Sequence, residues 1–170
     1  GNVLVSEGPY GYTYIPNTGK KGTSDYKIGH YEINKSEAIN VKKMFEWIAD
    51  EGLTLRAVVR RLQEQGIQPR KSKRGVWNTS TLSTLLRNQT YIGKAHWGTT
   101  YAVVPENPIK NQKYKKVKKS SRRMNPREEW VTIEVPRMIS DDLFYRTGQK
   151  LRDNFAVLGR NKKNDYIVKY

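Results

Sequence analysis

Cysteine is absent from all 170 residues of the chain. Without thiols it forms neither disulfides nor cysteine-based zinc sites, and a reducing cytoplasm is its natural setting. Long apolar stretches are also lacking, since no run approaches the roughly 18 residues of a membrane-spanning helix. The first residues lack the basic-then-apolar pattern of a signal peptide. We therefore expect a cytoplasmic protein without membrane contact, and a first residue of Gly1 rather than Met suggests a fragment.

Acidic side chains are scarce in one part of the chain. The whole sequence has 32 Lys and Arg against 16 Asp and Glu, a formal net charge of +16. Between residues 67 and 127, however, fifteen basic residues stand against the single acid Glu106. A local basic excess of this kind is typical of a nucleic-acid-binding surface. A membrane-surface protein would need an amphipathic helix with bulky apolar residues opposite its basic ones, and no predicted helix has that form.

Catalytic patterns are missing as well. The sequence has no glycine-rich phosphate loop and no pair of clustered carboxylates, and its two histidines, His30 and His96, fall in unrelated predicted strands. Serines are plentiful, but none has neighbours in the sequence that would activate it. We therefore expect a binding module that needs no metal and no cofactor, and no enzymatic activity in this fragment.

Three helices are predicted in the first half of the chain. Asn34 and Glu37 have the spacing of a capping box, which begins a helix that runs to Glu51 and ends at Gly52. Thr54 caps a second helix with a clear amphipathic pattern, which Gly66 stops. Asn78 caps a short third helix that runs to Arg87 and carries three leucines on one face. Two helices, a connection and a polar helix outline a helix-turn-helix-like unit with an inserted basic loop.

Short strands are predicted around these helices. Residues 10–15 and 26–33 form one hairpin, and residues 91–97 and 99–104 form a second hairpin joined at Gly98. Residues 130–135 form a strand, Ser140 caps a final helix, and residues 166–170 resemble another strand. The predicted fold is therefore α+β: a small helical cluster with a helix-turn-helix-like unit, flanked by short antiparallel hairpins and followed by a basic arm and a strand-helix segment.

The same patterns predict three parts. Residues 1–105 form the DNA-binding domain, 106–128 a basic linker or arm, and 129–170 a strand-helix segment that either packs on the first domain or starts a second subdomain.

The third helix is the predicted reading element for double-stranded DNA. The face opposite its leucines is small, rich in hydroxyls and free of acids, so it could approach base edges closely. Basic residues of the loop before it and of the strand after it would contact the backbone. The predicted DNA-facing residues of helix, loop and strand are Thr79, Ser80, Ser83, Thr84, Arg87, Arg70, Lys71, Lys73, Arg74 and Lys94. The competing interpretation is a short capped helix with an ordinary polar surface.

The stretch from Lys110 to Arg127 holds nine basic residues and no acid. We expect it to be mobile alone and ordered on a polyanion, where it would contact phosphates. The residues predicted to do so are Lys115, Lys116, Lys118, Lys119, Arg122 and Arg123. The alternative is a solvated linker.

Several short motifs, in this order, resemble one family. They are Gly8-Pro9-Tyr10-Gly11-Tyr12, Glu37-Ala38 with Phe45, Gly52-Leu53-Thr54-Leu55, Leu62, Gly66-Ile67, Trp77 and the run from Leu86 to Lys94. The later order of Trp130, Ile139-Ser140, Phe144 and Leu151 fits as well. Together they resemble the recombinase domain of the large serine recombinases, which are phage integrases and transposon or cassette recombinases.

The resemblance implies a multi-domain parent, encoded by a bacterium or phage and associated with the nucleoid. Its N-terminal catalytic domain, absent from this fragment, would carry a serine that forms a phosphoserine bond to DNA. The parent would act as a tetramer that brings two recombination sites together and integrates or excises a mobile element. Members usually continue into a cysteine-rich zinc ribbon, but this chain has no cysteine, so zinc is not carried over.

Two other classes of function stay open from the residues alone. One is a stand-alone nucleic-acid-binding protein, such as a transcription regulator or an RNA- or ribosome-associated protein. The other is a hydrolase or nuclease with an unrecognised site. Binding to duplex DNA against structured RNA separates the first from a recombinase fragment, and metal-dependent nicking would support the second.

Overall fold

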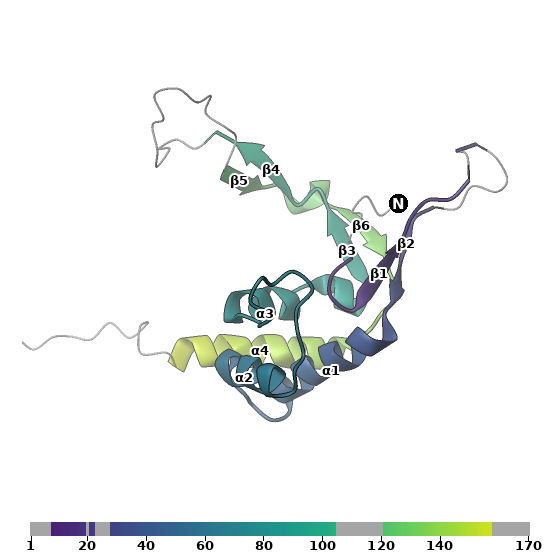
Figure 1. The fold of residues 1–170 in the computed structure, drawn as a ribbon. Helices are drawn as coiled ribbons and strands as arrows, with labels where there is room; N and C mark the ends of the chain where they lie inside the picture. Colours follow the sequence, from purple (N-terminus) through teal and green to yellow (C-terminus); the bar gives the residue numbers. More distant parts are fainter. Residues whose placement is uncertain (1–7, 20, 23–27, 105–120, 158–170) are drawn as a thin grey trace, which may run out of the picture.

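The computed structural model describes residues 8–19, 21–22, 28–104 and 121–157 of the chain. Four helices form the body of the protein: α1 (Lys35–Ala49), α2 (Leu55–Glu64), α3 (Thr79–Leu86) and α4 (Asp141–Val157). Helix α1 packs against α2 and α4, and α3 also contacts α2 and α4 (Figure 1). With three small antiparallel sheets beside these helices, the predicted α+β class is confirmed.

The first three helices begin where the sequence predicts and end one or two residues before the predicted ends. The side-chain oxygens of Asn34, Thr54 and Asn78 each accept a hydrogen bond from the backbone N–H three residues later. They satisfy donors that a helix start otherwise leaves free. Gly52 and Gly66 follow α1 and α2 with φ of +67°. This left-handed conformation is open to glycine without a steric penalty, so the chain turns away there.

Glu37 is used differently from the predicted capping box. Its Oε2 accepts a hydrogen bond of 2.7 Å from the backbone N–H of Gly11, and its carboxylate also pairs with Arg70. The backbone N–H of Asn34, which the capping box assigns to Glu37, donates to the carbonyl of Gly11 at 2.8 Å. Gly11 of the N-terminal segment thus provides the hydrogen bonds to Glu37 and Asn34 that the capping box would form between these two residues.

The first predicted hairpin is confirmed, with shorter strands. Strand β1 (Tyr12–Ile15) pairs antiparallel with β2 (His30–Ile33), so that Tyr12 lies opposite Ile33. His30 is a strand residue, as predicted. Residues 26 and 27, the start of the predicted second strand, lie outside the described residues.

The second predicted hairpin is wrong. Residues 89–92 form a short 3-10 helix, η1 (Gln89–Ile92), and β3 (Lys94–Trp97) pairs with β6 (Val131–Glu134). Strand β4 (Thr100–Val103) pairs with β5 (Ser121–Met124), and η2 (Arg127–Glu129) connects β5 to β6. The two pairs follow one another as a narrow structure that projects from the helical body (Figure 1). We refer to residues 94–103 and 121–134 as the ribbon.

Gly98 bends the ribbon rather than reversing the chain. Its carbonyl accepts a hydrogen bond of 2.5 Å from the Asn125 side chain, and the Thr99 carbonyl accepts one of 3.0 Å from the Asn125 backbone. The Trp130 indole N–H donates to the Asn125 carbonyl at 3.0 Å. The partners of Gly98 therefore come from a segment 27 residues away, which no local turn rule reveals.

Strand β5 also corrects part of the predicted basic arm. Arg122 and Arg123, expected to become ordered only on a polyanion, lie on this strand, and Arg122 Nη1 donates to Thr100 Oγ1 at 3.3 Å. The four arm lysines from Lys115 to Lys119 lie outside the described residues, as does the strand predicted at 166–170.

One hydrophobic core ties the N-terminal strand, η1 and the helices together. Tyr12 and Tyr91 are buried with ring centroids 5.9 Å apart, and Phe45 of α1 lies at the same distance from Tyr91. The Tyr12 hydroxyl lies 2.9 Å from the Thr90 carbonyl, and the Tyr91 hydroxyl donates to the Tyr10 carbonyl at 2.7 Å. Burial raises the pKa of both phenols, so they stay neutral hydrogen-bond donors.

The C-terminal helix lies on this core. Ser140 caps α4, as predicted, with its Oγ accepting from the Leu143 N–H at 3.3 Å. Phe144 stacks at 6.0 Å from Phe45, and the buried Thr147 hydroxyl donates to the Leu143 carbonyl at 2.8 Å. Through α4 on α1 and β6 on β3, residues 129–157 pack on the first hundred residues.

Candidate nucleic-acid interface

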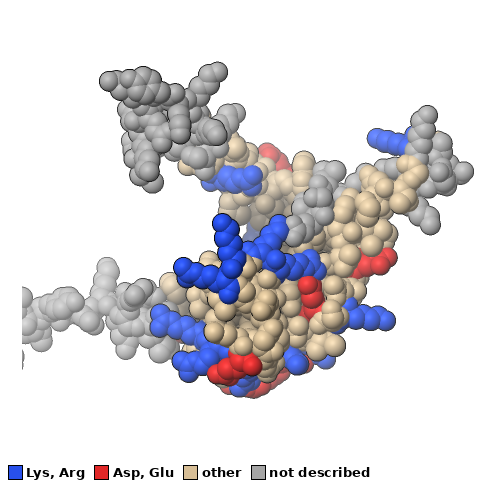
Figure 2. Space-filling model, in the orientation of Figure 1, with Lys and Arg blue, Asp and Glu red and all other residues tan. Residues whose placement is uncertain are grey.

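A cleft of about 1380 Å³ runs between the helical body and the base of the ribbon. One wall combines the loop at residues 69–73 with one face of α3, and we call it the helical wall. The other, the ribbon wall, contains Gln89, Ala95, His96, Thr99, Arg127 and Trp130. Tyr10 and Trp77 lie between them, with rings edge to face at 5.0 Å. Figure 2 shows basic side chains gathered on the side of the body that faces the ribbon.

The charge of the cleft has one sign. Its lining among the described residues contains no Asp or Glu, and its basic members are Arg70, Lys71, Lys73, Arg87 and Arg127. Walls of one charge focus the electrostatic field inside a cleft and concentrate ions of the opposite sign. The cleft is therefore suited to a large polyanion.

Helix α3 presents one flank of its polar surface to the cleft. Leu82, Leu85 and Leu86 are buried, which fixes the rotation of the helix. Of the predicted DNA-facing residues, Ser80, Thr84 and Arg87 line the cleft, whereas Thr79 and Ser83 do not. Ser83 is also half-buried rather than exposed as predicted.

Sequence reasoning missed Asn78 and Thr81, which share the cleft face. A signal for them existed, because positions 78, 81 and 84 recur every three residues along one side of a helix. The Asn78 side chain also caps the helix, accepting from the Thr81 N–H at 2.7 Å. The Thr84 hydroxyl donates to the Ser80 carbonyl at 3.0 Å, so its oxygen is left with acceptor capacity toward the cleft.

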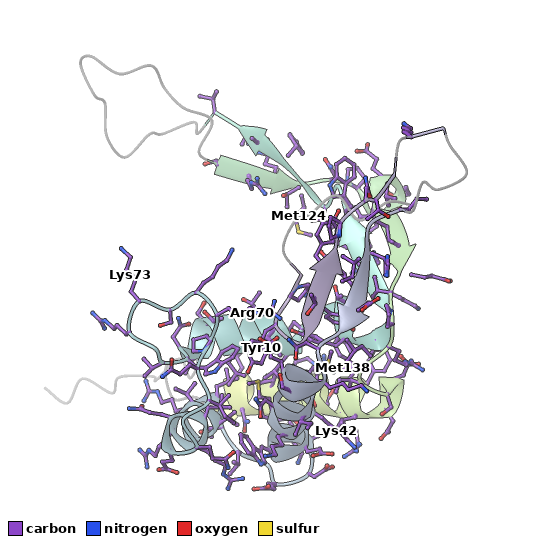
Figure 3. All side chains as sticks on the ribbon, turned by 45° about the vertical axis from the view of Figure 1, so that its right-hand side comes forward. Tyr10, Lys42, Arg70, Lys73, Met124 and Met138 are labelled. Carbon is purple, nitrogen blue, oxygen red and sulfur yellow. The ribbon has the colours of Figure 1, made fainter. Side chains whose placement is uncertain are left out.

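The basic loop carries some cations that line the cleft and one that does not. Lys71 and Lys73 line the cleft and are exposed, and Figure 3 shows Lys73 projecting from the loop away from the helical body. Arg74 is exposed but does not line the cleft. Lysines on such a loop suit contacts with phosphate as point charges.

Arg70 holds the loop to the protein itself. Its Nε donates to Glu37 Oε1 at 2.8 Å and its Nη2 to the Tyr12 carbonyl at 2.8 Å, while Nη1 donates to the Gly8 carbonyl at 3.2 Å. The guanidinium also lies 5.9 Å from the Tyr10 ring centroid, toward which it points in Figure 3. Arg70 also lines the cleft, and the described structure gives it this intramolecular role.

The remaining predicted residues lie away from the cleft. Lys94 begins β3 opposite Glu134, and Arg122 and Arg123 are exposed on β5; none of the three lines the cleft.

The ribbon wall was missed as part of the site. Its Gln89 comes from η1, His96 from β3 and Trp130 from the residue before β6. The His96 ring lies 5.5 Å from the Trp130 ring, and the Arg127 guanidinium lies 5.7 Å from the Trp130 ring centroid. No local motif unites these residues, because the pairing of β3 with β6 brings them together.

Two further features of the described residues bear on the class of site. No group of three His, Cys, Asp or Glu side chains in this part of the chain is arranged to hold a metal ion. None of the described helices has the length and apolar character needed to cross a bilayer.

Two solved structures share the fold. One is described as "Crystal Structure of a LSR-DNA Complex", with a TM-score of 0.54 and 15% identity over 95% of this chain and 37% of the other. The second, "Sequence Requirements of the Listeria innocua prophage attP site", has a TM-score of 0.53 and 15% identity over 95% of this chain and 49% of the other. The chain thus spans less than half of either protein. No curated protein matches it.

The chain therefore shares the fold of part of each of these two proteins. The Recombinase family model matches residues 35–154, most of the chain, and the chain belongs to this family. The predicted resemblance to a recombinase domain is confirmed by this family match, and the fold is shared with the protein of the LSR–DNA complex.

Proposed function

We propose that this chain binds double-stranded DNA in the cleft, as the DNA-binding part of a site-specific serine recombinase that integrates or excises a mobile element. The observation that carries the proposal is a cleft whose described lining contains no acid and in which the hydroxyl-bearing face of α3 lies beside Lys71 and Lys73. The fold shared with an LSR–DNA complex and with a structure concerning a prophage attP site supports DNA as the partner.

Helix α3 is the element that enters the major groove in this proposal. The groove admits one α-helix, and short side chains let the helix backbone approach base edges. Ser80, Thr81 and Thr84 carry hydroxyls that pair with donors or acceptors on most bases, and Arg87 at the end of the helix reaches guanine or a phosphate. Sequence is read by such contacts to base edges in the groove.

Basic residues on both walls position the duplex. Lys71 and Lys73 neutralise phosphates on the helical side and Arg127 on the ribbon side. Lys115, Lys116, Lys118 and Lys119 extend this backbone contact from outside the described residues. These contacts add affinity without choosing sequence.

The chemistry of strand exchange belongs, in this proposal, to a serine nucleophile elsewhere in a tetrameric parent protein. The pure chain is expected neither to nick nor to rejoin supercoiled plasmid, with or without Mg²⁺.

A charge placed in the cleft tests the proposal. Thr84→Glu should abolish binding to duplex DNA, because its carboxylate would face the bases and phosphates, while leaving thermal unfolding unchanged, since Thr84 is exposed. Thr79→Glu is the matched control, an exposed threonine of the same helix outside the cleft lining, and should retain most of the affinity. The measurement is titration of a labelled duplex with structured RNA as competitor.

Normal duplex binding by Thr84→Glu would exclude α3 as the reading element. A preference for the structured RNA would favour a different class of nucleic-acid-binding protein.

A further inference from the structure

A chain of three polar side chains crosses the ribbon wall. His96 Nε2 lies 2.6 Å from Gln89 Oε1, and His96 Nδ1 lies 3.0 Å from Thr132 Oγ1. The three residues come from η1, β3 and β6, and Thr132 is directly opposite His96 in the strand register. Gln89 and His96 both line the cleft, and Gln89 is exposed.

The direction of these hydrogen bonds follows from their chemistry. An amide oxygen only accepts, so His96 Nε2 carries a proton and donates it to Gln89. The Thr132 hydroxyl can then donate to Nδ1 of the neutral ring. The amide oxygen of Gln89 is thereby engaged, whereas its amide nitrogen has no hydrogen-bond acceptor among the described residues. Gln89 therefore offers the cleft two N–H donors.

The backbone that carries Gln89 is held rigidly. Asn88 caps η1, with its Oδ1 accepting from the Thr90 N–H at 3.0 Å, and Gly93 closes it with a left-handed φ of +90°. Tyr91, two residues after Gln89, is fully part of the core. A polar side chain fixed at both ends loses little conformational entropy when it binds, which is how recognition residues gain affinity and selectivity.

We propose that Gln89 is a specificity-determining residue of this cleft and that His96 is its positioning residue. The inference rests on the proposed binding of duplex DNA. Two donors from one amide match two neighbouring acceptors on one base, and guanine presents such a pair, N7 and O6, in the major groove. Gln89 follows Arg87, the C-cap of α3, by two residues, and both line the cleft. In this proposal both therefore reach the groove that the helix occupies. Gln89 thus selects guanine at one position of the site.

Selection from a pool of random-sequence duplexes tests this assignment. The wild-type chain should enrich a consensus with guanine at one position that Gln89→Ala no longer requires. A bidentate base contact is worth about 1–3 kcal/mol, so discrimination at that position should fall by about 5- to 150-fold, with the other positions unchanged. Gln63→Ala is the matched control, an exposed glutamine of α2 outside the cleft, and should return the wild-type consensus.

Two further variants separate base reading from a merely structural tie between η1 and the ribbon. Gln89→Glu keeps an oxygen for His96 Nε2 but faces the cleft with acceptors, so it should reject guanine at the same position. His96→Phe keeps a ring against Trp130 but frees the amide, and should relax that one position while the chain unfolds at nearly the wild-type temperature.

An unchanged consensus for both Gln89 variants, obtained while the wild-type chain does enrich a site, would overturn the assignment of Gln89 and leave the proposed function standing. If His96→Phe only lowers the unfolding temperature and leaves the consensus intact, His96 has no positioning role. If the wild-type chain enriches no duplex at all, the proposed function falls, and the role of Gln89 falls with it.

Discussion

The helical wall of the cleft is local in sequence, whereas the ribbon wall joins residues far apart along the chain. Asn78 and Arg87 cap the two ends of the single helix that carries Thr84, and the leucines of this helix fix its rotation. On the ribbon wall, His96 meets a partner 36 residues away, Thr132. A helical face repeats every three to four residues and is legible in the sequence, but strand pairing depends on a register that distant segments set together. We therefore expect substitutions on the two walls to differ in their effects on stability and on DNA binding.

The largest expected effect concerns the basic loop of the helical wall. Arg70→Ala should lower the free energy of unfolding by about 2–3 kcal/mol, because it leaves a half-buried carboxylate and two carbonyls without their charged donor. Denaturant titration measures the loss. Lys73→Ala is the matched control from the same loop and should leave stability within about 0.5 kcal/mol of wild type, as surface substitutions usually do. Equal stability of the two variants would show that Arg70 is an ordinary surface residue.

The second prediction asks whether Arg87, on the helical wall, contacts a base or a phosphate. As a base reader, Arg87→Ala should cost about 1–3 kcal/mol of binding to the selected site and relax one position. As a phosphate contact, it should weaken all duplexes evenly. Competition between the selected duplex and its single-base variants separates the two roles. Arg87→Lys helps to distinguish them, because it keeps the charge but not the planar fork that reads guanine.

The burial of Tyr91, which lies in the core between the two walls, can be tested by the dependence of stability on pH. Unfolded tyrosine loses its proton near pH 10, but burial raises the pKa of Tyr91 in the folded chain. The folded state therefore binds more protons than the unfolded state in this range, and stability falls as pH rises above about 10. Tyr91→Phe removes this contribution and should flatten the fall by about 1.4 kcal/mol per pH unit. An unchanged slope of stability against pH would mean that Tyr91 ionises normally in the fold.

The smallest expected effects are on the salt dependence of DNA binding, for one proposed phosphate contact on each wall. Lys73→Ala on the helical wall and Arg127→Ala on the ribbon wall should each reduce the salt slope of DNA binding by about 0.9. Titrations at several salt concentrations, with the same duplex, measure both. Arg56 on α2 is exposed and outside the cleft lining, so Arg56→Ala should leave the slope unchanged. A flattened slope for only one wall would place the duplex against that wall alone.

Much of the fold could be predicted because its signals are local. The caps at Asn34, Thr54 and Asn78 and the glycine stop at Gly52 depend on residues three or four positions apart. The segment that bends at Gly98 could not be predicted in the same way. A glycine between two short strands suits a reversal and a bend equally, and only the hydrogen bonds from Asn125 decide for the bend.

The lining of the candidate site could likewise be predicted only in part. The hydroxyl face of α3 and the lysines of the loop follow from pattern and charge, and Ser80, Thr84, Lys71 and Lys73 do line the cleft. Which flank of α3 borders the cleft depends on where the ribbon lies, so Thr79 and Ser83 fell outside it and Thr81 inside. Gln89 gave no signal, because its polar partner arrives with β3.

The sequence by itself determined the class of the protein, its basic middle third and the positions of its helices, since composition, capping and helical periodicity are properties of neighbouring residues. The tertiary structure alone decided that Arg70 holds the loop while Lys73 is exposed at the cleft, although both belong to one basic run. A charge is engaged inside a protein or presented to a partner according to which groups the fold brings near it. For Arg70 those groups are Glu37 and the carbonyls of the N-terminal segment, 33 or more residues away along the chain.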